Sequence, residues 1–257
     1  MKTKTVLIYF LMILFTLSIK AQDAKQVISD MIETVGGKAN FYKLKNVTYD
    51  YEYINPKAPM TLKSHETYVF HKEKSHAAYS TNTVTAPDGQ KVVEGYDGTN
   101  AWVTMDGKLS NDEQANNFAR FMRKTNYYWF SMFFKLLDDG VNHEYLGSKT
   151  VNGKAYDKVK ITFGNNVGDA QDIYVLFINK ETKLVDQFLF TVMSFQMAEP
   201  QLMVMEYVTI DGIQIGSKRK YIEADWEGNI KGKQWVTTNW SNIDFDTDVD
   251  ISLFERP

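Results

Sequence analysis

The chain has 257 residues, of which 14% are aromatic and none is cysteine. Its 29 basic and 32 acidic side chains leave a formal net charge of −3 without any basic run, which argues against a nucleic-acid-binding protein. Without cysteine the chain can form neither disulfides nor the lipid attachment of a bacterial lipoprotein, so we expect no lipid anchor.

The first 21 residues have the layout of a secretory signal peptide. Lys2 and Lys4 precede an apolar run from Val6 to Ile19, and Ala21 is a small residue at which a signal peptidase would cut. The run is shorter than the about 20 apolar residues that a membrane span needs, although an uncleaved anchor remains the alternative. We therefore expect residues 1–21 to be removed and the rest to be periplasmic or secreted.

Short strands dominate the mature chain after one opening helix. Apolar residues recur at helical spacing over 23–36, which predicts an amphipathic helix that ends at Gly36-Gly37. Period-two alternation begins at Val47, and turn sequences such as Pro87-Asp88-Gly89 and Asp106-Gly107 follow. Strands joined by tight turns predict an antiparallel meander.

The strand pattern is interrupted once, between residues 111 and 137. Ser110 and Glu113 match a capping box, and apolar residues follow at helical spacing. A second helical segment from Tyr127 to Leu137 is apolar almost all round, which is typical of buried helices. The sequence thus predicts a two-helix lid over the open face of a sheet.

Strands resume after residue 140 and continue to the C-terminal region. Asn152-Gly153 and Asp211-Gly212 are strong hairpin turns between strand-like runs. Neither a linker nor a low-complexity segment interrupts the chain, so we expect one domain over residues 22–257.

Several turn sequences resemble the outer-membrane lipoprotein carrier (Lol-type) superfamily, within an uncharacterised secreted branch of unknown function. They are residues 94–102, with an Asp-Gly turn before Trp102, residues 151–159 around Asn152-Gly153, and the closing residues 249–257. The resemblance implies a mainly β (α+β) fold, in which a curved antiparallel sheet forms a half-open barrel with an N-terminal helix and a central lid. It also implies a concavity that holds acyl chains, but no residue matches a lipid-binding position of the carriers.

Aromatic and methionine residues in two stretches are candidates for lining a hydrophobic cavity. Methionine adapts to varied apolar ligands, and an acyl chain needs an apolar cavity with few polar anchors. The same side chains could instead fill a core beneath a helical lid. The candidate ligand-binding residues are Phe118, Phe121, Met122, Tyr128, Trp129, Met132, Phe133, Met193, Phe195, Met203 and Met205.

Neither the histidines nor the C-terminal acidic run predicts a metal site. His65 and His71 share a strand face about 20 Å apart, too far for one ion. The aspartates between Asp244 and Asp250 mimic a calcium loop, but Val249 occupies the position at which that loop needs glycine. The four histidines are His65, His71, His76 and His143.

Recognisable catalytic motifs are missing from the sequence. It contains no nucleophile elbow, no zinc-binding His-Glu-x-x-His, no phosphate-binding glycine loop and no cysteine nucleophile. We therefore expect no enzyme and no cofactor, but a soluble periplasmic binding or carrier protein for a lipid, a lipoprotein acyl chain or another apolar ligand. The alternatives are an envelope protein-interaction module with a packed barrel and no ligand, and a secreted hydrolase.

Export predicts a defined mature N-terminus. Cleavage after Ala21 should leave Gln22 as the first residue, because the small residue follows the apolar run directly. N-terminal sequencing of the protein from the cell envelope checks this. Recovery of membrane-bound protein that still begins at Met1 would contradict it.

Overall fold

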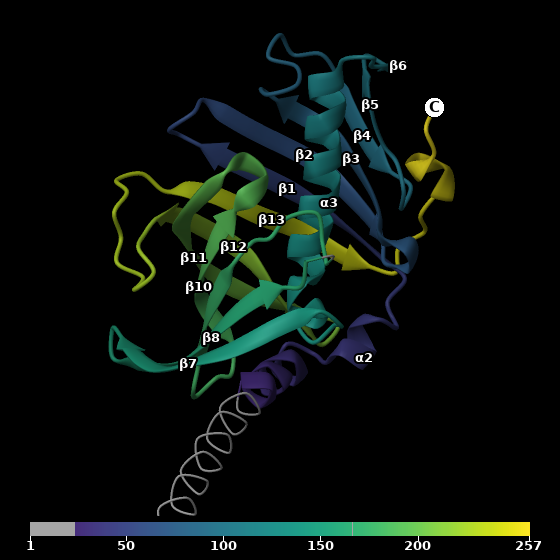
Figure 1. Ribbon diagram of the computed structural model, residues 1–257. Helices are drawn as coiled ribbons and strands as arrows, with labels where there is room; N and C mark the ends of the chain where they lie inside the picture. Colours follow the sequence, from purple (N-terminus) through teal and green to yellow (C-terminus); the bar gives the residue numbers. More distant parts are fainter. Residues whose placement is uncertain (1–23, 166) are drawn as a thin grey trace, which may run out of the picture. The chain divides into compact units, whose positions relative to one another are not determined.

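The structure is a computed structural model that describes residues 24–165 and 167–257 (Figure 1). The predicted signal peptide over 1–21 lies outside the described residues. The chain divides into two compact units. Within the described residues, unit 1 comprises 24–34, Lys135–Met203 without residue 166, and Glu223–Ile230, and unit 2 comprises Val35–Phe134, Val204–Ile222 and Lys231–Pro257. The expectation of a single domain over 22–257 stays a prediction.

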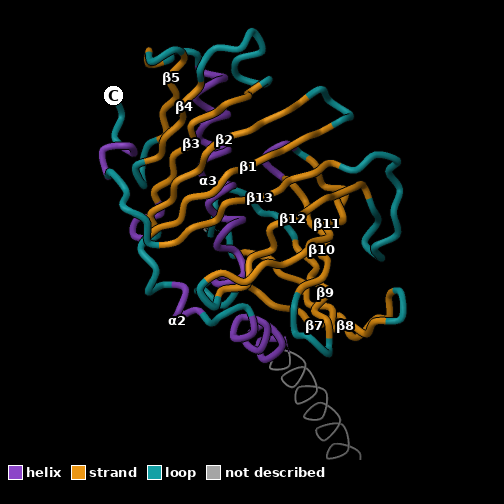
Figure 2. The backbone as a smooth tube through the Cα atoms, turned by 180° about the vertical axis from the view of Figure 1, so that it is seen from behind, coloured by secondary structure: helices purple, strands orange, loops and turns teal. Residues whose placement is uncertain are grey.

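Thirteen described strands form one sheet, in the order β6-β5-β4-β3-β2-β1-β13-β12-β11-β10-β9-β8-β7 (Figure 2). The order is linear, so the sheet has the edges β6 and β7 and stays open. The strands are β1 (Asn46–Asn55), β2 (Met60–Val69), β3 (Lys74–Asn82), β4 (Val92–Tyr96), β5 (Ala101–Met105), β6 (Lys108–Leu109), β7 (Val141–Val151), β8 (Lys154–Phe163), β9 (Tyr174–Asn179), β10 (Val185–Val192), β11 (Met197–Ile210), β12 (Ile213–Glu223) and β13 (Val236–Phe245).

Helices occupy a small part of the described chain. Residues 24–34 are helical, as the apolar spacing predicted, and no helix of the described residues is long and apolar enough to cross a membrane. The predicted mainly β fold with an open antiparallel sheet and an N-terminal helix is confirmed. The other helical segments are α2 (Lys38–Phe41), α3 (Glu113–Lys135) and the 3-10 turns η1 (His71–Glu73), η2 (Met193–Phe195) and η3 (Ile251–Phe254).

In unit 1 the strands β7 to β10 form antiparallel pairs. Val151 of β7 pairs with Lys154 of β8 around the predicted Asn152-Gly153 turn, in which both residues have positive φ, 50° and 80°. All six residues of β9 are buried, as expected for a strand that is apolar on both faces. Ile28 and Met31 of the N-terminal helix are completely buried.

In unit 2 the central strand β1 pairs with β2 on one side and with β13 on the other. Val47, Tyr49 and Tyr51 are buried, as period-two alternation predicted. The helix α3 packs on this buried face, where its Phe130 ring stacks on Tyr49 with the ring centroids 5.3 Å apart. Figure 1 shows α3 running alongside these strands.

The prediction of two helices between 111 and 137 is wrong, because α3 is one continuous helix of 23 residues. The junction between the two expected segments contains neither glycine nor proline, so no residue there stops the helix. The predicted Ser110–Glu113 capping box also does not form. Asp112 caps the helix instead, since its Oδ1 accepts the backbone N–H of Ala115 at 3.0 Å.

A buried ion-pair network fastens α3 to the sheet of unit 2. Arg123 of α3 donates from Nη1 to Oε2 of Glu66 at 2.5 Å and from Nε to Oε2 of Glu94 at 3.0 Å. The three side chains are fully buried. Tyr68 donates its hydroxyl hydrogen to Glu66, and Tyr79 donates to Glu94. Burial raises the pKa of Glu94, and the charge of Arg123 acts in the opposite direction.

Removing the cation of this network should destabilise the fold strongly. Replacement of Arg123 with Met leaves two carboxylates buried without their partner, which should lower the free energy of unfolding by about 3–5 kcal/mol. Urea denaturation measures the loss. Arg120→Met is the matched control, because Arg120 is exposed on the same helix. Equal stability losses in the two variants would contradict the anchoring role.

Candidate ligand-binding site

The helix α3 has two apolar sides that differ in burial. Met122, Tyr127, Phe130 and Phe134 are among the residues buried in the structure. Five aromatic residues elsewhere on the helix are only half-buried, although all five are large. They are Phe118, Phe121, Tyr128, Trp129 and Phe133. This half-buried aromatic surface is the part of α3 that could contact an apolar ligand.

The sequence-predicted cavity residues fall into different environments. Met122, Met132 and Met203 are buried and pack as core residues, whereas Met205 is half-buried. Met193 and Phe195 in η2 are 39% and 55% exposed. The candidates of α3 and Met205 belong to unit 2, and Met193, Phe195 and Met203 belong to unit 1. That all eleven line one cavity therefore stays a prediction.

Sequence reasoning missed Arg219, a buried cation on the inner face of β12. Only 7% of its surface is exposed. Its guanidinium carbon lies 3.5 Å from the ring centroid of Trp240 on β13 and 5.5 Å from that of Trp129 on α3. The available signal was alternation, since Ile215 and Ser217 are buried in register with Arg219 while Lys218 is exposed.

No described carboxylate forms a salt bridge with Arg219. Burial lowers the pKa of Arg219 to about 10, and the nearby phenols of Tyr49 and Tyr51 act in the opposite direction. The side chain is therefore still cationic at neutral pH. Within residues 24–165 and 167–257, neither Nε of Arg219 nor Nε1 of Trp240 has a hydrogen-bond acceptor. A buried charge without a partner is costly, which marks this position as a candidate binding site.

Tyrosine hydroxyls lie on the same inner face. The hydroxyl oxygens of Tyr53 and Tyr221 are 2.7 Å apart and share a hydrogen bond. Burial raises the pKa of Tyr51 and of Tyr221, so both phenols are neutral at physiological pH. These groups offer polar contacts without neutralising the charge of Arg219.

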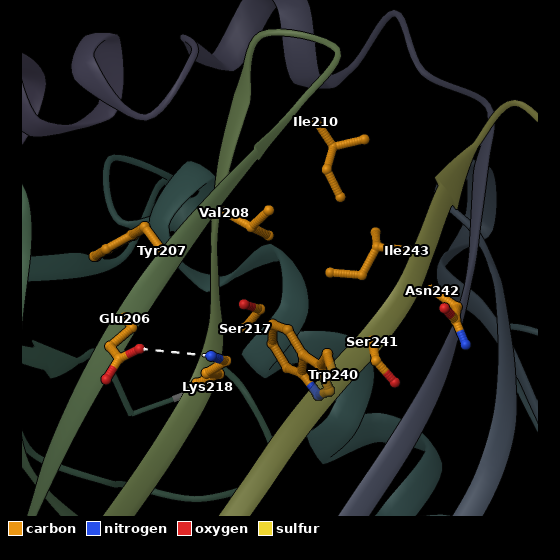
Figure 3. A pocket seen from close by; sticks show the side chains of 10 residues that line it. All are labelled: Glu206, Tyr207, Val208, Ile210, Ser217, Lys218, Trp240, Ser241, Asn242 and Ile243. Atoms are coloured by element: carbon orange, nitrogen blue, oxygen red, sulfur yellow. Dashed lines mark ion pairs between the residues drawn. The ribbon is translucent and has the colours of Figure 1, made fainter.

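A pocket of about 320 Å³ lies between β11, β12 and β13 in unit 2 (Figure 3). Strands β12 and β13 pair from Tyr221 with Val236 to Lys218 with Asn239. Ser217 and Trp240, which line the pocket, are the next residues along the two strands. An exposed ion pair joins Glu206 and Lys218 at 3.9 Å. The pocket is lined by Glu206, Tyr207, Val208, Ile210, Ser217, Lys218, Trp240, Ser241, Asn242 and Ile243.

Trp240 connects the pocket to the buried cation, because it lines the pocket and the guanidinium of Arg219 lies over its ring. Val208, Ile210 and Ile243 surround the open space in Figure 3 and supply apolar contacts. The arrangement combines an apolar hollow with a buried positive charge next to it. Such a combination suits a ligand that is apolar at one end and anionic at the other.

The histidines occupy separate positions. Nδ1 of His65 lies 2.9 Å from a carboxylate oxygen of Asp50, and Nε2 of His143 lies 2.6 Å from the carbonyl oxygen of Leu136. His76 is buried beside the rings of Trp102 and Phe254. Throughout the described parts of the chain, no group of three or more His, Cys, Asp or Glu side chains could hold a metal ion.

His76 should make stability depend on pH. Burial lowers the pKa of His76 from 6.5 to about 4, so the folded state favours the neutral ring. The free energy of unfolding is therefore unaffected by His76 above pH 6.5. As the pH falls toward 4 it decreases by up to about 3 kcal/mol, because the unfolded chain binds the proton more readily. Urea denaturation across this range checks the slope. His76→Phe should flatten it, whereas the exposed His65→Phe should not; identical slopes would contradict the assignment.

The fold resembles that of three solved structures. A DUF1329 family protein from Desulfovibrio piger is 14% identical, with a TM-score of 0.56, over 92% of this chain and 97% of that one. A LolA superfamily protein from Nitrosomonas europaea is 11% identical, with a TM-score of 0.56, over 91% and 97%. A domain from Vibrio parahaemolyticus, assigned to outer membrane lipoprotein sorting, is 9% identical, with a TM-score of 0.53, over 91% and 97%.

These likenesses show the fold and confirm the predicted resemblance to the Lol-type superfamily. No curated protein matches the sequence. A family model covers residues 4–200 and is described as a family of unknown function. The chain therefore belongs to the DUF6503 family.

Proposed function

We propose that this protein binds the acyl chain of a lipid or a lipoprotein and carries it in the periplasm or outside the cell. The observation that carries the proposal is the half-buried aromatic surface of α3, which includes Trp129 near Arg219 and Trp240. The fold shared with a LolA superfamily protein supports it.

The aromatic surface supports binding because it leaves apolar area that a ligand could bury. Aromatic side chains dominate the energetics of interfaces, and half-buried ones retain part of that area. An acyl chain gains about 0.8 kcal/mol for each CH₂ group that it buries, so a stripe along several helical turns could hold a chain without specific hydrogen bonds. This binding role needs no catalytic group.

A second candidate function is an envelope protein that binds another protein. It is favoured by the exposed apolar residues at and beside η2 in unit 1, Met193, Phe195 and Met197, which are 39%, 55% and 42% exposed. Grouped exposed apolar residues are typical of interaction surfaces. Phe195→Ser should then weaken partner binding and leave acyl binding unchanged.

Acyl binding predicts a dependence on chain length. In a titration with fatty acids of increasing length, each added CH₂ group should strengthen binding by up to about fourfold, until the apolar surface is filled. Intrinsic tryptophan fluorescence or calorimetry measures the affinity.

Trp129→Ala should weaken binding of the longer acids, because it removes the indole beside Arg219. Trp226→Ala is the matched control, since Trp226 lies in unit 1 and is 36% exposed. Absence of binding by the longest soluble acid would contradict the acyl-carrier proposal and favour the second candidate function, binding to another protein.

A further inference from the structure

Arg219 and Trp240 together present hydrogen-bond donors without acceptors. The guanidinium lies over the face of the indole, 3.5 Å from its ring centroid. The donors of a guanidinium lie in its own plane, so stacking by the face leaves those donors available. Nε of Arg219 and Nε1 of Trp240 are both buried, and neither finds an acceptor in the described chain. Two neighbouring buried N–H donors therefore lack a hydrogen-bond acceptor.

We infer that Arg219 and Trp240 form a receptor for the anionic head group of an acyl ligand, namely a carboxylate or a phosphate monoester. The inference rests on the proposed function, because it assigns the polar end of the ligand whose chain contacts the apolar surface.

An anionic oxygen fits the missing partner better than a neutral acceptor. Arginine binds carboxylates and phosphates with charge-assisted hydrogen bonds, which are shorter and stronger than neutral ones. The hydroxyls of Tyr49 and Tyr68, two phenols that act on the pKa of Arg219, already share a hydrogen bond with each other. A carboxylate or phosphate would both neutralise the buried charge and accept the unused donors. No carboxylate of the described chain pairs with Arg219 in this way.

The position of the receptor also suits an amphiphile. The guanidinium carbon of Arg219 lies 5.5 Å from the ring centroid of Trp129 on α3, so the aromatic surface of α3 reaches the charge. Trp240 and Ser217 line the pocket between β11, β12 and β13, and Ser217 lies on the same strand face as Arg219. A ligand in the pocket therefore contacts the indole on which the guanidinium stacks.

A purely structural role for Arg219 makes a different prediction. If the stack on Trp240 were only a packing contact, its removal would destabilise the protein without any effect that depends on the head group. If Arg219 is a receptor, the ligand-free protein holds an uncompensated cation, and an apolar replacement of similar length should preserve or raise its stability. Thermal unfolding of ligand-free Arg219→Met distinguishes these outcomes.

The binding test compares three probes that share one chain and differ in head group: hexadecanoic acid, hexadecyl phosphate and hexadecanol. Each displaces a fluorescent fatty acid from the full mature protein at a pH at which the acid is ionised. In Arg219→Met, binding of the two anionic probes should weaken on the order of 10- to 100-fold, because a charge-assisted hydrogen bond is lost. Binding of the alcohol should stay the same or strengthen.

Two further variants complete the test. Lys220→Met removes a cation from the neighbouring residue of the same strand, where the side chain is exposed and lies outside the pocket lining, and should leave all three affinities unchanged. Arg219→Lys keeps the positive charge and should recover part of the selectivity for the anionic probes. Inorganic phosphate and acetate serve as chainless competitors; displacement by either at comparable concentration would point to a free anion rather than a lipid head group as the ligand.

The outcomes separate this inference from the proposed function. If none of the probes binds the unaltered protein, the acyl-carrier function fails. If all three bind and Arg219→Met weakens them equally, or weakens none, the acyl carrier stands and the head-group receptor is wrong. If Arg219→Met unfolds at a much lower temperature than the unaltered protein, Arg219 is a packing residue, and the inference is likewise overturned.

Discussion

Arg123 holds α3 against the sheet of unit 2, and the position of every candidate ligand contact on that helix depends on it. The guanidinium joins a carboxylate on β2 to a carboxylate on β4, so the helix is fixed to two strands at once. Trp129 follows less than two helical turns later. A shift of the helix would therefore move Trp129 away from Arg219 and would separate the aromatic surface from the buried charge.

The two buried arginines of unit 2 illustrate opposite solutions to the same energetic problem. Arg123 is surrounded by acceptors, including both oxygens of Glu66, and its charge is compensated within the protein. Arg219 has aromatic rings and neutral phenols around it. Because burying an unpaired charge is unfavourable, proteins that do so usually gain something in function. Of the two arginines, Arg219 is therefore the candidate for ligand binding, whereas Arg123 and its polar network stabilise the fold.

The sequence predicted those parts of the fold that depend on neighbouring residues, namely strand faces and tight turns. Alternation identified the buried side of β1, and Asn152-Gly153 identified a hairpin, since positive φ at both residues is specific to a narrow set of turns. The capping box failed because Asp112 offered a competing cap two residues beyond Ser110. Arg219 could be placed on an inner face by alternation, but the absence of a carboxylate around it is a property of the folded chain.

The pairing of β1 with β13 has a consequence for how the protein is made. Val47 pairs with Phe245, so the central strand of unit 2 has a neighbour from near the end of the chain. Contacts between residues so far apart in sequence form slowly, and they cannot form before the C-terminal strand has left the ribosome. Until then one side of β1 presents unpaired backbone groups, a template for pairing with other chains. Pairing of β1 on this side therefore waits for β13, and the chain has to be kept from aggregating until that strand has been made.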